Sequence, residues 1–292
     1  MNQTTTSLWR DYLELTKPGV QALLFVSCIS GMLIGSKFSP PLSIFIFGLL
    51  GISFLAASAA VINHIFDSEI DAKMNRTASR PLVKGSITEF SASVFAAALY
   101  VSGSLMLLIY VNALTWILTS LTFIFYAFIY TRYLKFMTSQ NIVIGGLAGA
   151  MPPLLGWTAV SNTIEPNAWL LVLIVMVWTP PHFWALAVYR VDDYAEAAVP
   201  MLPVQKGIAF TKQHIVLYTL LLLASTMLPY AVNMFQELYL VVALILGLGF
   251  LYFSIKLYRD DTNASAMQTF AYSISYLAAL FGAMLVDQYL YL

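Results

Sequence analysis

The sequence predicts an all-α membrane protein with about nine transmembrane helices. Hydrophobic residues make up 60% of the 292 positions, charged residues make up 10%, and the mean hydropathy is +0.80. This composition excludes an ordinary soluble domain. The apolar residues form continuous runs rich in Leu, Ala, Ile and Phe, whereas the strands of a β-barrel would appear as short alternating segments. The formal net charge is zero, so no overall electrostatic attraction to nucleic acid is expected.

The first expected element is a short amphipathic helix that lies on the membrane before Lys17-Pro18-Gly19. Leu8, Trp9 and Tyr12 recur there at helical spacing. Residues 1–17 lack an apolar core of signal-peptide length, so we expect an interfacial segment of a single domain, 1–292. The spans that follow are expected at about 20–36, 42–66, 90–110, 112–131, 141–160, 167–189, 213–231, 238–257 and 266–288.

The positions of the basic residues predict the orientation. Of the 14 Lys and Arg residues, only Lys37 falls in a connection after an odd-numbered span. The others precede the first span or follow the second, fourth, sixth and eighth. Because cytoplasmic connections carry the excess of Lys and Arg, the N-terminus is expected in the cytoplasm and the C-terminus outside.

The most informative stretch is the polar segment 63–85, which follows the second apolar run. Asn63, Asp67 and Asp71 are each one helical turn apart, and His64 falls beside them on the same stripe. Two carboxylates on adjacent turns repel each other, and a hard divalent cation with oxygen ligands would relieve that repulsion. We therefore expect a metal site on this helix face.

Four cations, Lys73, Arg76, Arg80 and Lys84, follow within a short distance. Such a set is typical of a site for a polyanion such as diphosphate. The alternative is a solvated loop whose basic residues reflect only the cytoplasmic charge bias. This alternative stays open from these residues alone.

Proline pairs occur in the fifth and sixth spans, and a histidine follows the second pair. Pro152-Pro153 should kink or break the fifth span. In the sixth, His182 follows a proline pair that frees backbone carbonyls, so this imidazole is either functional or a cap for the freed groups. Beyond that span, Asp192 and Asp193 offer a second acidic set, or else ordinary carboxylates paired with Arg190.

The motifs that carry a family resemblance are Leu15-Thr16-Lys17-Pro18, Asn63-x-x-x-Asp67-x-x-x-Asp71, Arg76-Thr77, Arg80-Pro81-Leu82-Val83-Lys84-Gly85, Tyr130-Thr131 with Lys135, Pro181-His182-Phe183-Trp184, Asp193-Tyr194 and Pro200-Met201-Leu202-Pro203. The resemblance that they carry covers nearly the whole chain. They resemble the UbiA-type intramembrane prenyltransferases, and within these the branch that acts on haem. The sequence departs from the superfamily at His64, where many members have another Asp, and in the second motif, which lacks two aspartates at four-residue spacing.

The resemblance implies nine helices around a central cavity and transfer of a farnesyl group from farnesyl diphosphate to a vinyl group of haem b. Addition of water then gives haem O. The implied cofactor is Mg²⁺, and the implied location is a bacterial inner membrane. The implied partners are the two substrates and the bilayer, with an association with haem A synthase or a terminal oxidase pathway.

The expected site residues divide into four groups. The catalytic group is Asn63, Asp67, Asp71, Tyr130 and Asp193, and the metal ligands are Asn63, Asp67, Asp71, Asp192 and Asp193. The diphosphate group is Arg76, Arg80, Lys84, Lys135 and Arg190, and the candidates for contact with haem are His182 and His64.

Two other functions are compatible with these residues. A prenyltransferase acting on an aromatic quinone precursor would use the same diphosphate chemistry, and a haem difference spectrum would distinguish it. A membrane transporter would also carry intramembrane charges and broken helices. It is disfavoured because the charged groups gather at one membrane face, and diphosphate release without vectorial flux would exclude it.

Overall fold

The computed structural model describes residues 8–74 and 77–292. Within these ranges all regular structure is helical, and nine segments are long and apolar enough to cross a membrane. The prediction of an all-α protein with nine spans is confirmed. The spanning segments are α2 (Pro18–Gly35), α3 (Leu42–Asp71), α5 (Glu89–Tyr110), Ala113–Met137, Asn141–Ser161, α10 (Pro166–Tyr189), α13 (Ile208–Ala231), α14 (Glu237–Arg259) and α15 (Ala266–Leu290).

Two of the nine segments are irregular. The fourth consists of α6 (Ala113–Ile124), the π-helix η1 (Phe125–Leu134) and α7 (Lys135–Met137). The fifth is divided into α8 (Asn141–Ala150) and α9 (Pro152–Ser161), as expected from a proline pair that cannot donate to the helix. In α10, by contrast, Pro180 and Pro181 lie inside one uninterrupted helix.

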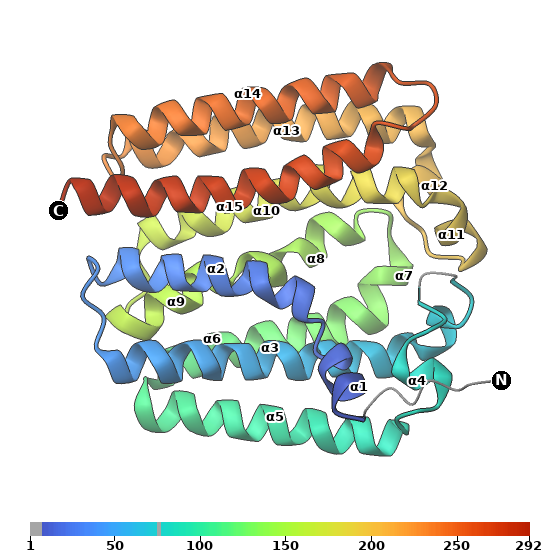
Figure 1. Ribbon diagram of the computed structural model, residues 1–292, viewed down its shortest axis with the longest axis horizontal. Helices are drawn as coiled ribbons and strands as arrows, with labels where there is room; N and C mark the ends of the chain where they lie inside the picture. The colour runs from blue at the N-terminus through green and yellow to red at the C-terminus, as the bar shows by residue number, and fades with distance from the viewer. Residues whose placement is uncertain (1–7, 75–76) are drawn as a thin grey trace.

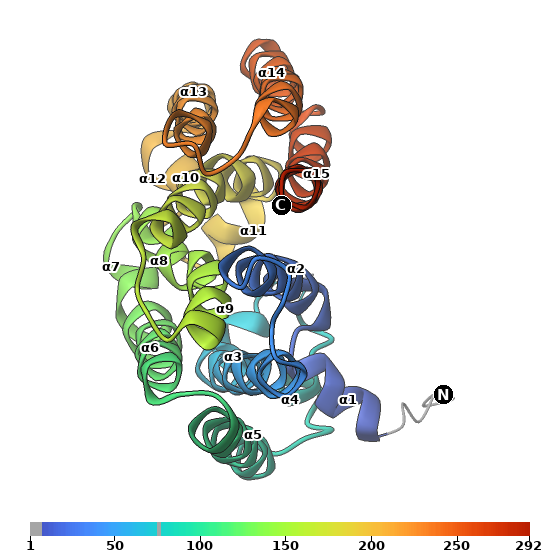
Figure 2. The same ribbon diagram turned by 90° about the vertical axis from the view of Figure 1, so that its left-hand side faces the viewer.

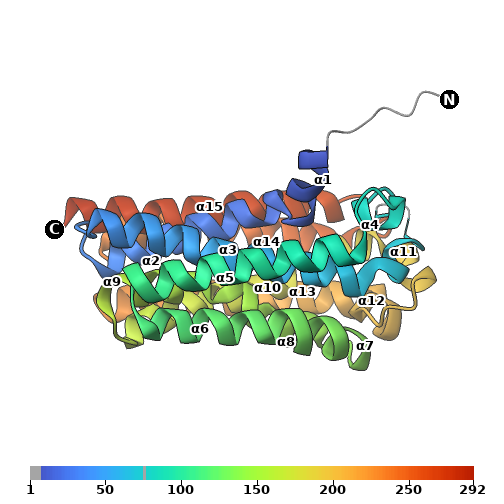
Figure 3. The ribbon, with the colours of Figure 1, turned by 90° about the horizontal axis from the view of Figure 1, so that it is seen from below.

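Four short helices lie near one end of the spanning helices: α1 (Leu8–Leu15), α4 (Pro81–Lys84), α11 (Val191–Glu196) and α12 (Leu202–Lys206). Figure 1 shows α4, α7, α11 and α12 at the right-hand end of the molecule, opposite the C-terminus, and Figure 3 shows the same end from below. The polar connections after α3, α7 and α10 therefore share one membrane face.

The spanning helices pack so that the first contacts the last. Figure 2 shows α2 between α3 and α15, and α10 beside the group formed by α13, α14 and α15. The close approach of α2 to α9 depends on glycine. A side chain at Gly31 would collide with the carbonyl oxygen of Pro153, and one at Gly156 would collide with that of Cys28. Small residues allow this close packing where lipid provides no hydrophobic driving force between helices.

A small apolar cluster joins two of the connections at the polar end. Met74, just after α3, packs in one buried cluster with Tyr194, Ala197 and Val199 from the segment after α10. This contact holds the two connections together over the end of α3 and so positions the polar residues described next.

Candidate active site

The last turns of α3 carry the centre of the site. Asn63 and Asp67 are each only 4% exposed. The Asn63 amide donates from Nδ2 to Asp67 Oδ2 over 3.0 Å, and also to Thr131 Oγ1 of η1 over 3.0 Å. The predicted shared helix face is therefore present, and a second helix supports it.

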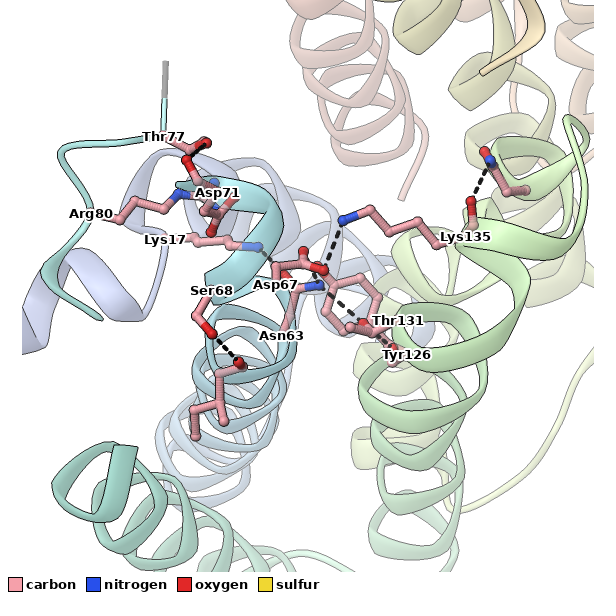
Figure 4. Close-up of polar contacts among 12 residues, drawn as sticks. Lys17, Asn63, Asp67, Ser68, Asp71, Thr77, Arg80, Tyr126, Thr131 and Lys135 are labelled. Atoms are coloured by element: carbon pink, nitrogen blue, oxygen red, sulfur yellow. Dashed lines mark hydrogen bonds and ion pairs between the residues drawn. The ribbon is translucent and has the colours of Figure 1, made fainter. Parts of the chain in front are cut away.

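Three basic side chains from three different segments reach this face (Figure 4). Lys17 donates to Asn63 Oδ1, Lys135 Nζ lies 2.8 Å from Asp67 Oδ1, and Arg80 pairs with Asp71 Oδ2. Leaving a buried carboxylate without its partner costs about 3–5 kcal/mol, so these contacts hold the two carboxylate side chains in place.

Local structure explains how each cation reaches the site. Lys17 has a left-handed backbone, with φ 54°, at the turn that redirects the chain from α1 into α2. The chain after α3 turns back on itself, and Thr77 donates from Oγ1 to the carbonyl of Asp71 over 2.9 Å, which brings Arg80 alongside. Lys135 begins α7, directly after the wide turns of η1.

An apolar cavity of about 140 Å³ lies below this cluster. Lys17, Gln21 and Tyr126 line it near the polar end, and Cys28 and Leu155 line it deeper in the membrane. From Lys17 to Cys28 is eleven residues of α2, or about 16 Å at the helical rise. The cavity therefore joins a charged mouth to an apolar interior.

Two tyrosines of η1 stand beside this mouth. The rings of Tyr126 and Tyr130 are stacked, with centroids 5.7 Å apart and planes inclined by 16°. A side chain at Gly145 would overlap the Tyr130 ring, so this glycine of α8 leaves room for the tyrosine. The predicted catalytic Tyr130 thus lies close to the cluster but one turn beyond the cavity-lining Tyr126.

His64 is buried inside the polar cluster, at 2% exposure. Neither of its ring nitrogens has a hydrogen-bond partner among residues 8–74 and 77–292. Burying a polar atom without a hydrogen-bond partner costs free energy of folding. The two ring nitrogens of His64 are therefore suited to bind a group that arrives with the substrates.

The second acidic motif has a basic neighbour of its own. Asp193 pairs with Arg190 at 3.3 Å, while Asp192 is exposed on α11. Within the described ranges, no group of three or more His, Cys, Asp or Glu side chains lies close enough to hold a metal ion. Lys84 is also exposed, and the predicted Arg76 lies outside the described residues.

His182 lies between α10 and α15. Its ring is stacked on Trp178 on one side and on Phe270 on the other, with centroid distances of 4.1 and 4.6 Å. Its Nδ1 atom lies 2.6 Å from Ser273 Oγ. Of the two alternatives left open by the sequence, the capping of a carbonyl freed by the prolines is not seen, because the hydrogen-bond partner of the ring is the Ser273 hydroxyl.

Reasoning from the sequence missed two of the residues that form the cluster. Lys17 and Thr131 both touch Asn63, although they are 46 and 68 positions away from it. Each belongs to a motif quoted for the family resemblance, which was the only available signal.

The oxygen atoms of Asn63, Asp67 and Asp71 are chemically suited to Mg²⁺, which prefers carboxylate and carbonyl oxygen. Their present partners are cations, and those cations are also suited to diphosphate oxygens. The donor set therefore fits a magnesium ion that arrives together with a diphosphate. Asn63, Asp67 and Asp71, all in the last turns of α3, would hold the ion.

Comparison with known proteins agrees with this geometry. Residues 24–281 match the model of the UbiA prenyltransferase family. The chain is 53% identical over 282 residues to a protoheme IX farnesyltransferase of Saccharophagus degradans, covering 97% of this chain and 93% of the relative. It is 54% identical over 284 residues to one of Alcanivorax borkumensis, covering 97% and 94% of the two chains.

Solved structures share the fold at low identity. A structure of digeranylgeranylglyceryl phosphate synthase superimposes with a TM-score of 0.80 at 22% identity, over 97% of this chain and 99% of that one. A UbiA homolog from Archaeoglobus fulgidus bound to DMAPP and Mg²⁺ gives a TM-score of 0.70 at 16% identity, over 94% and 99%. The chain is a multi-pass membrane protein that belongs to the UbiA prenyltransferase family, among relatives that are protoheme IX farnesyltransferases.

Proposed function

We propose that this protein transfers a farnesyl group from farnesyl diphosphate to a vinyl group of haem b, with addition of water, to give haem O. The observation that carries the proposal is the cluster of cations and oxygen ligands at the mouth of an apolar cavity. Identity above 50% to protoheme IX farnesyltransferases supports haem, rather than a quinone precursor, as the acceptor.

The charge of the cluster favours an anion. Lys17, Arg80 and Lys135 provide three positive charges against the two carboxylates of Asp67 and Asp71. This leaves one positive charge in excess, in a setting with little water to screen it. A diphosphate bound together with a divalent cation would restore neutrality.

Asn63, Asp67 and Asp71 would hold Mg²⁺ at this face. When bound, the ion stabilises the charge on the departing diphosphate. Lys17, Arg80 and Lys135 contribute to the same stabilisation by binding diphosphate oxygens. Asp192 and Asp193 remain our predicted second acidic set for the metal, and Arg76, Lys84 and Arg190 remain predicted contacts to the diphosphate.

The hydrocarbon tail of the substrate is proposed to bind in the apolar cavity. The farnesyl tail would lie between α2, α3 and α9, where apolar walls exclude water from the allylic cation formed when its C–O bond breaks. Tyr126 at the mouth, with Tyr130 stacked behind it, presents an aromatic face that stabilises a nearby cation.

The acceptor side requires haem beside that cation. The vinyl group attacks the farnesyl carbon, a C–C bond forms, and the resulting cation next to the ring takes up water and releases a proton. We assign His182 to the haem iron, because neutral imidazole is the common protein ligand for that metal. His64, buried beside the polar cluster with both ring nitrogens lacking a partner among the described residues, is the second histidine proposed to contact the bound substrates.

We also propose the orientation and setting of the protein. The distribution of basic residues among the connections supports an orientation with the N-terminal α1 and the site on the cytoplasmic face of a bacterial inner membrane and the C-terminal end of α15 outside. Haem O would pass from here to haem A synthase or a terminal oxidase pathway, with which this protein is proposed to associate.

The direct test is mass spectrometry of haem after incubation of the purified protein with farnesyl diphosphate and Mg²⁺. The expected product is haem that has gained one farnesyl group and one hydroxyl group. Release of diphosphate without any change in haem mass, or alkylation of an aromatic quinone precursor instead, would refute the assignment of haem as acceptor.

A further inference from the structure

Four side chains form a compact cluster where α10 meets α15. His182 is stacked between Trp178 and Phe270, with interplanar angles of 16° and 23°. Ser273 of α15 touches two of them: its carbonyl accepts from Trp178 Nε1 over 2.9 Å, and its Oγ lies 2.6 Å from His182 Nδ1. Ser273 is fully buried.

The hydrogen bonds of Ser273 determine where the histidine proton lies. Ser273 Oγ also lies 2.6 Å from the carbonyl oxygen of Phe270, and two oxygens at that distance need a proton between them. The single hydroxyl proton of the serine therefore points to Phe270. His182 Nδ1 must then be the donor to Ser273 Oγ, because the hydroxyl has no second proton to give.

This assignment leaves His182 Nε2 as the nitrogen with the lone pair. Both faces of the ring are covered by aromatic rings and the Nδ1 edge is occupied, yet the residue is still half-buried rather than buried. The part of the ring that remains exposed is thus the edge that carries Nε2. No described residue hydrogen-bonds to that atom.

We propose that Ser273 is a positioning residue that fixes His182 in the tautomer whose Nε2 binds the haem iron. A histidine that binds a metal through one nitrogen typically donates a hydrogen bond from the other, and that donor bond sets both tautomer and ring orientation. The inference rests on the proposed function, because it takes haem as the ligand that Nε2 meets.

If Ser273 only stabilised the packing of α10 against α15, its removal would have a different effect. Stacking alone holds the ring in plane regardless of which nitrogen carries the proton. Ser273 adds the choice of proton position and, through its carbonyl, fixes the indole that covers one face of the imidazole. Only the positioning role predicts a change in the spectrum of bound haem when the hydroxyl is removed.

The test is haem titration of the purified full-length protein, followed by its Soret band, in wild type, Ser273→Ala, Ser273→Thr and His182→Ala. Ser254→Ala is the matched control, because Ser254 is another fully buried serine whose hydroxyl bonds only Thr219, at 2.9 Å, within the described residues. Binding of farnesyl diphosphate is measured in each variant as the readout of an intact fold.

We expect Ser273→Ala to bind haem about 10- to 100-fold more weakly, with a Soret band displaced toward that of His182→Ala. Ser273→Thr and Ser254→Ala should match wild type, and farnesyl diphosphate binding should persist throughout. If Ser273→Ala retains wild-type affinity and spectrum while His182→Ala loses them, the positioning role is overturned and the proposed function stands.

A second measurement needs no substitution of Ser273. Nitrogen-15 spectra of the histidine-labelled wild-type protein should show Nδ1 of His182 protonated and Nε2 unprotonated before haem is added, with the signal assigned by its absence in His182→Ala. A proton on Nε2 would overturn the inference. Failure of the wild-type protein to form farnesylated haem would instead refute the proposed function, which these spectra do not test.

Discussion

Lys135 Nζ lies 2.8 Å from Asp67 Oδ1, although the two residues belong to different spanning segments. The contact joins the start of α7 to the last turns of α3 (Figure 4). Asp67 also accepts from Asn63, so its two oxygens are held from two directions. A ligand that takes up the lysine would free one carboxylate oxygen, and this couples anion binding to metal binding.

Asp67→Ala is expected to abolish Mg²⁺-dependent release of diphosphate, with a loss on the order of 10²–10³-fold or more. Asn63 and the single remaining carboxylate, Asp71, hold a hard cation much more weakly than the full set, and Lys135 loses its partner. The measurement is diphosphate release by the purified variant at several Mg²⁺ concentrations. Asp261→Ala is the control, since it removes an exposed carboxylate from the connection between α14 and α15. Near-normal turnover of a correctly inserted Asp67→Ala protein would contradict the metal assignment.

Helical periodicity was enough to predict the first half of the site. Asn63, Asp67 and Asp71 are spaced by four, so their common face follows from one helix. The structure extends α3 to Asp71, five residues past the predicted end of the apolar run at 66, because its polar side chains find partners instead of ending the helix. The nine spans follow from hydropathy in the same way.

Periodicity could not predict the contacts that join distant segments. The approach of Lys17 to Asn63 depends on the turn between α1 and α2, and that of Lys135 depends on the π-helical turns of η1. The environment of His182 depends on α15, about 90 positions away, so a histidine after two prolines could not reveal its aromatic neighbours.

The orientation of the protein predicts which face each connection presents. Cysteines introduced after residue 85 and after residue 206 should react with an impermeant thiol reagent only from the cytoplasmic side. A cysteine at Lys37, in the connection between α2 and α3, should react only from the opposite side. A Cys28→Ala background removes the single native thiol. The same sidedness for all three positions would mean that the order of spans is wrong.

The connection between α14 and α15 should become less stable in acid. Hydrogen bonds from Ser265 and Thr262 lower the pKa of the Asp260 carboxyl below its usual range. Since the folded pKa is below the unfolded value of about 3.9, the stabilisation is complete above that pH and is lost as the pH falls from there toward the folded pKa. The measurement is amide hydrogen exchange at Thr262 and Ser265, whose N–H groups donate to this carboxylate at 2.9 and 2.7 Å.

Asp260→Asn supplies the comparison for that experiment. The amide cannot ionise, so exchange at Thr262 and Ser265 should be faster at neutral pH and should show no further acid-dependent step beyond the intrinsic one. An equal acid response in wild type and variant would show that another group controls this connection.

The deep end of the cavity is expected to select the length of the prenyl chain. Cys28 is 2% exposed and lines the cavity about 16 Å below Lys17 along α2. Cys28→Phe would place a ring where the end of a farnesyl tail lies, whereas the much shorter dimethylallyl diphosphate would not reach that depth. We expect the KM for farnesyl diphosphate to rise about tenfold or more, since overfilling a packed apolar site costs about 1–3 kcal/mol.

The comparison is the binding of dimethylallyl diphosphate, which Cys28→Phe should leave unchanged because the charged mouth at Lys17, Arg80 and Lys135 is untouched. Cys28→Ala tests whether the thiol itself matters, and it should bind both diphosphates as wild type does. Equal weakening of the long and the short substrate by Cys28→Phe would mean that the substitution disturbs the mouth. No effect on either would mean that the farnesyl tail follows a different path through the helices, and the assignment of this cavity to the tail would be wrong.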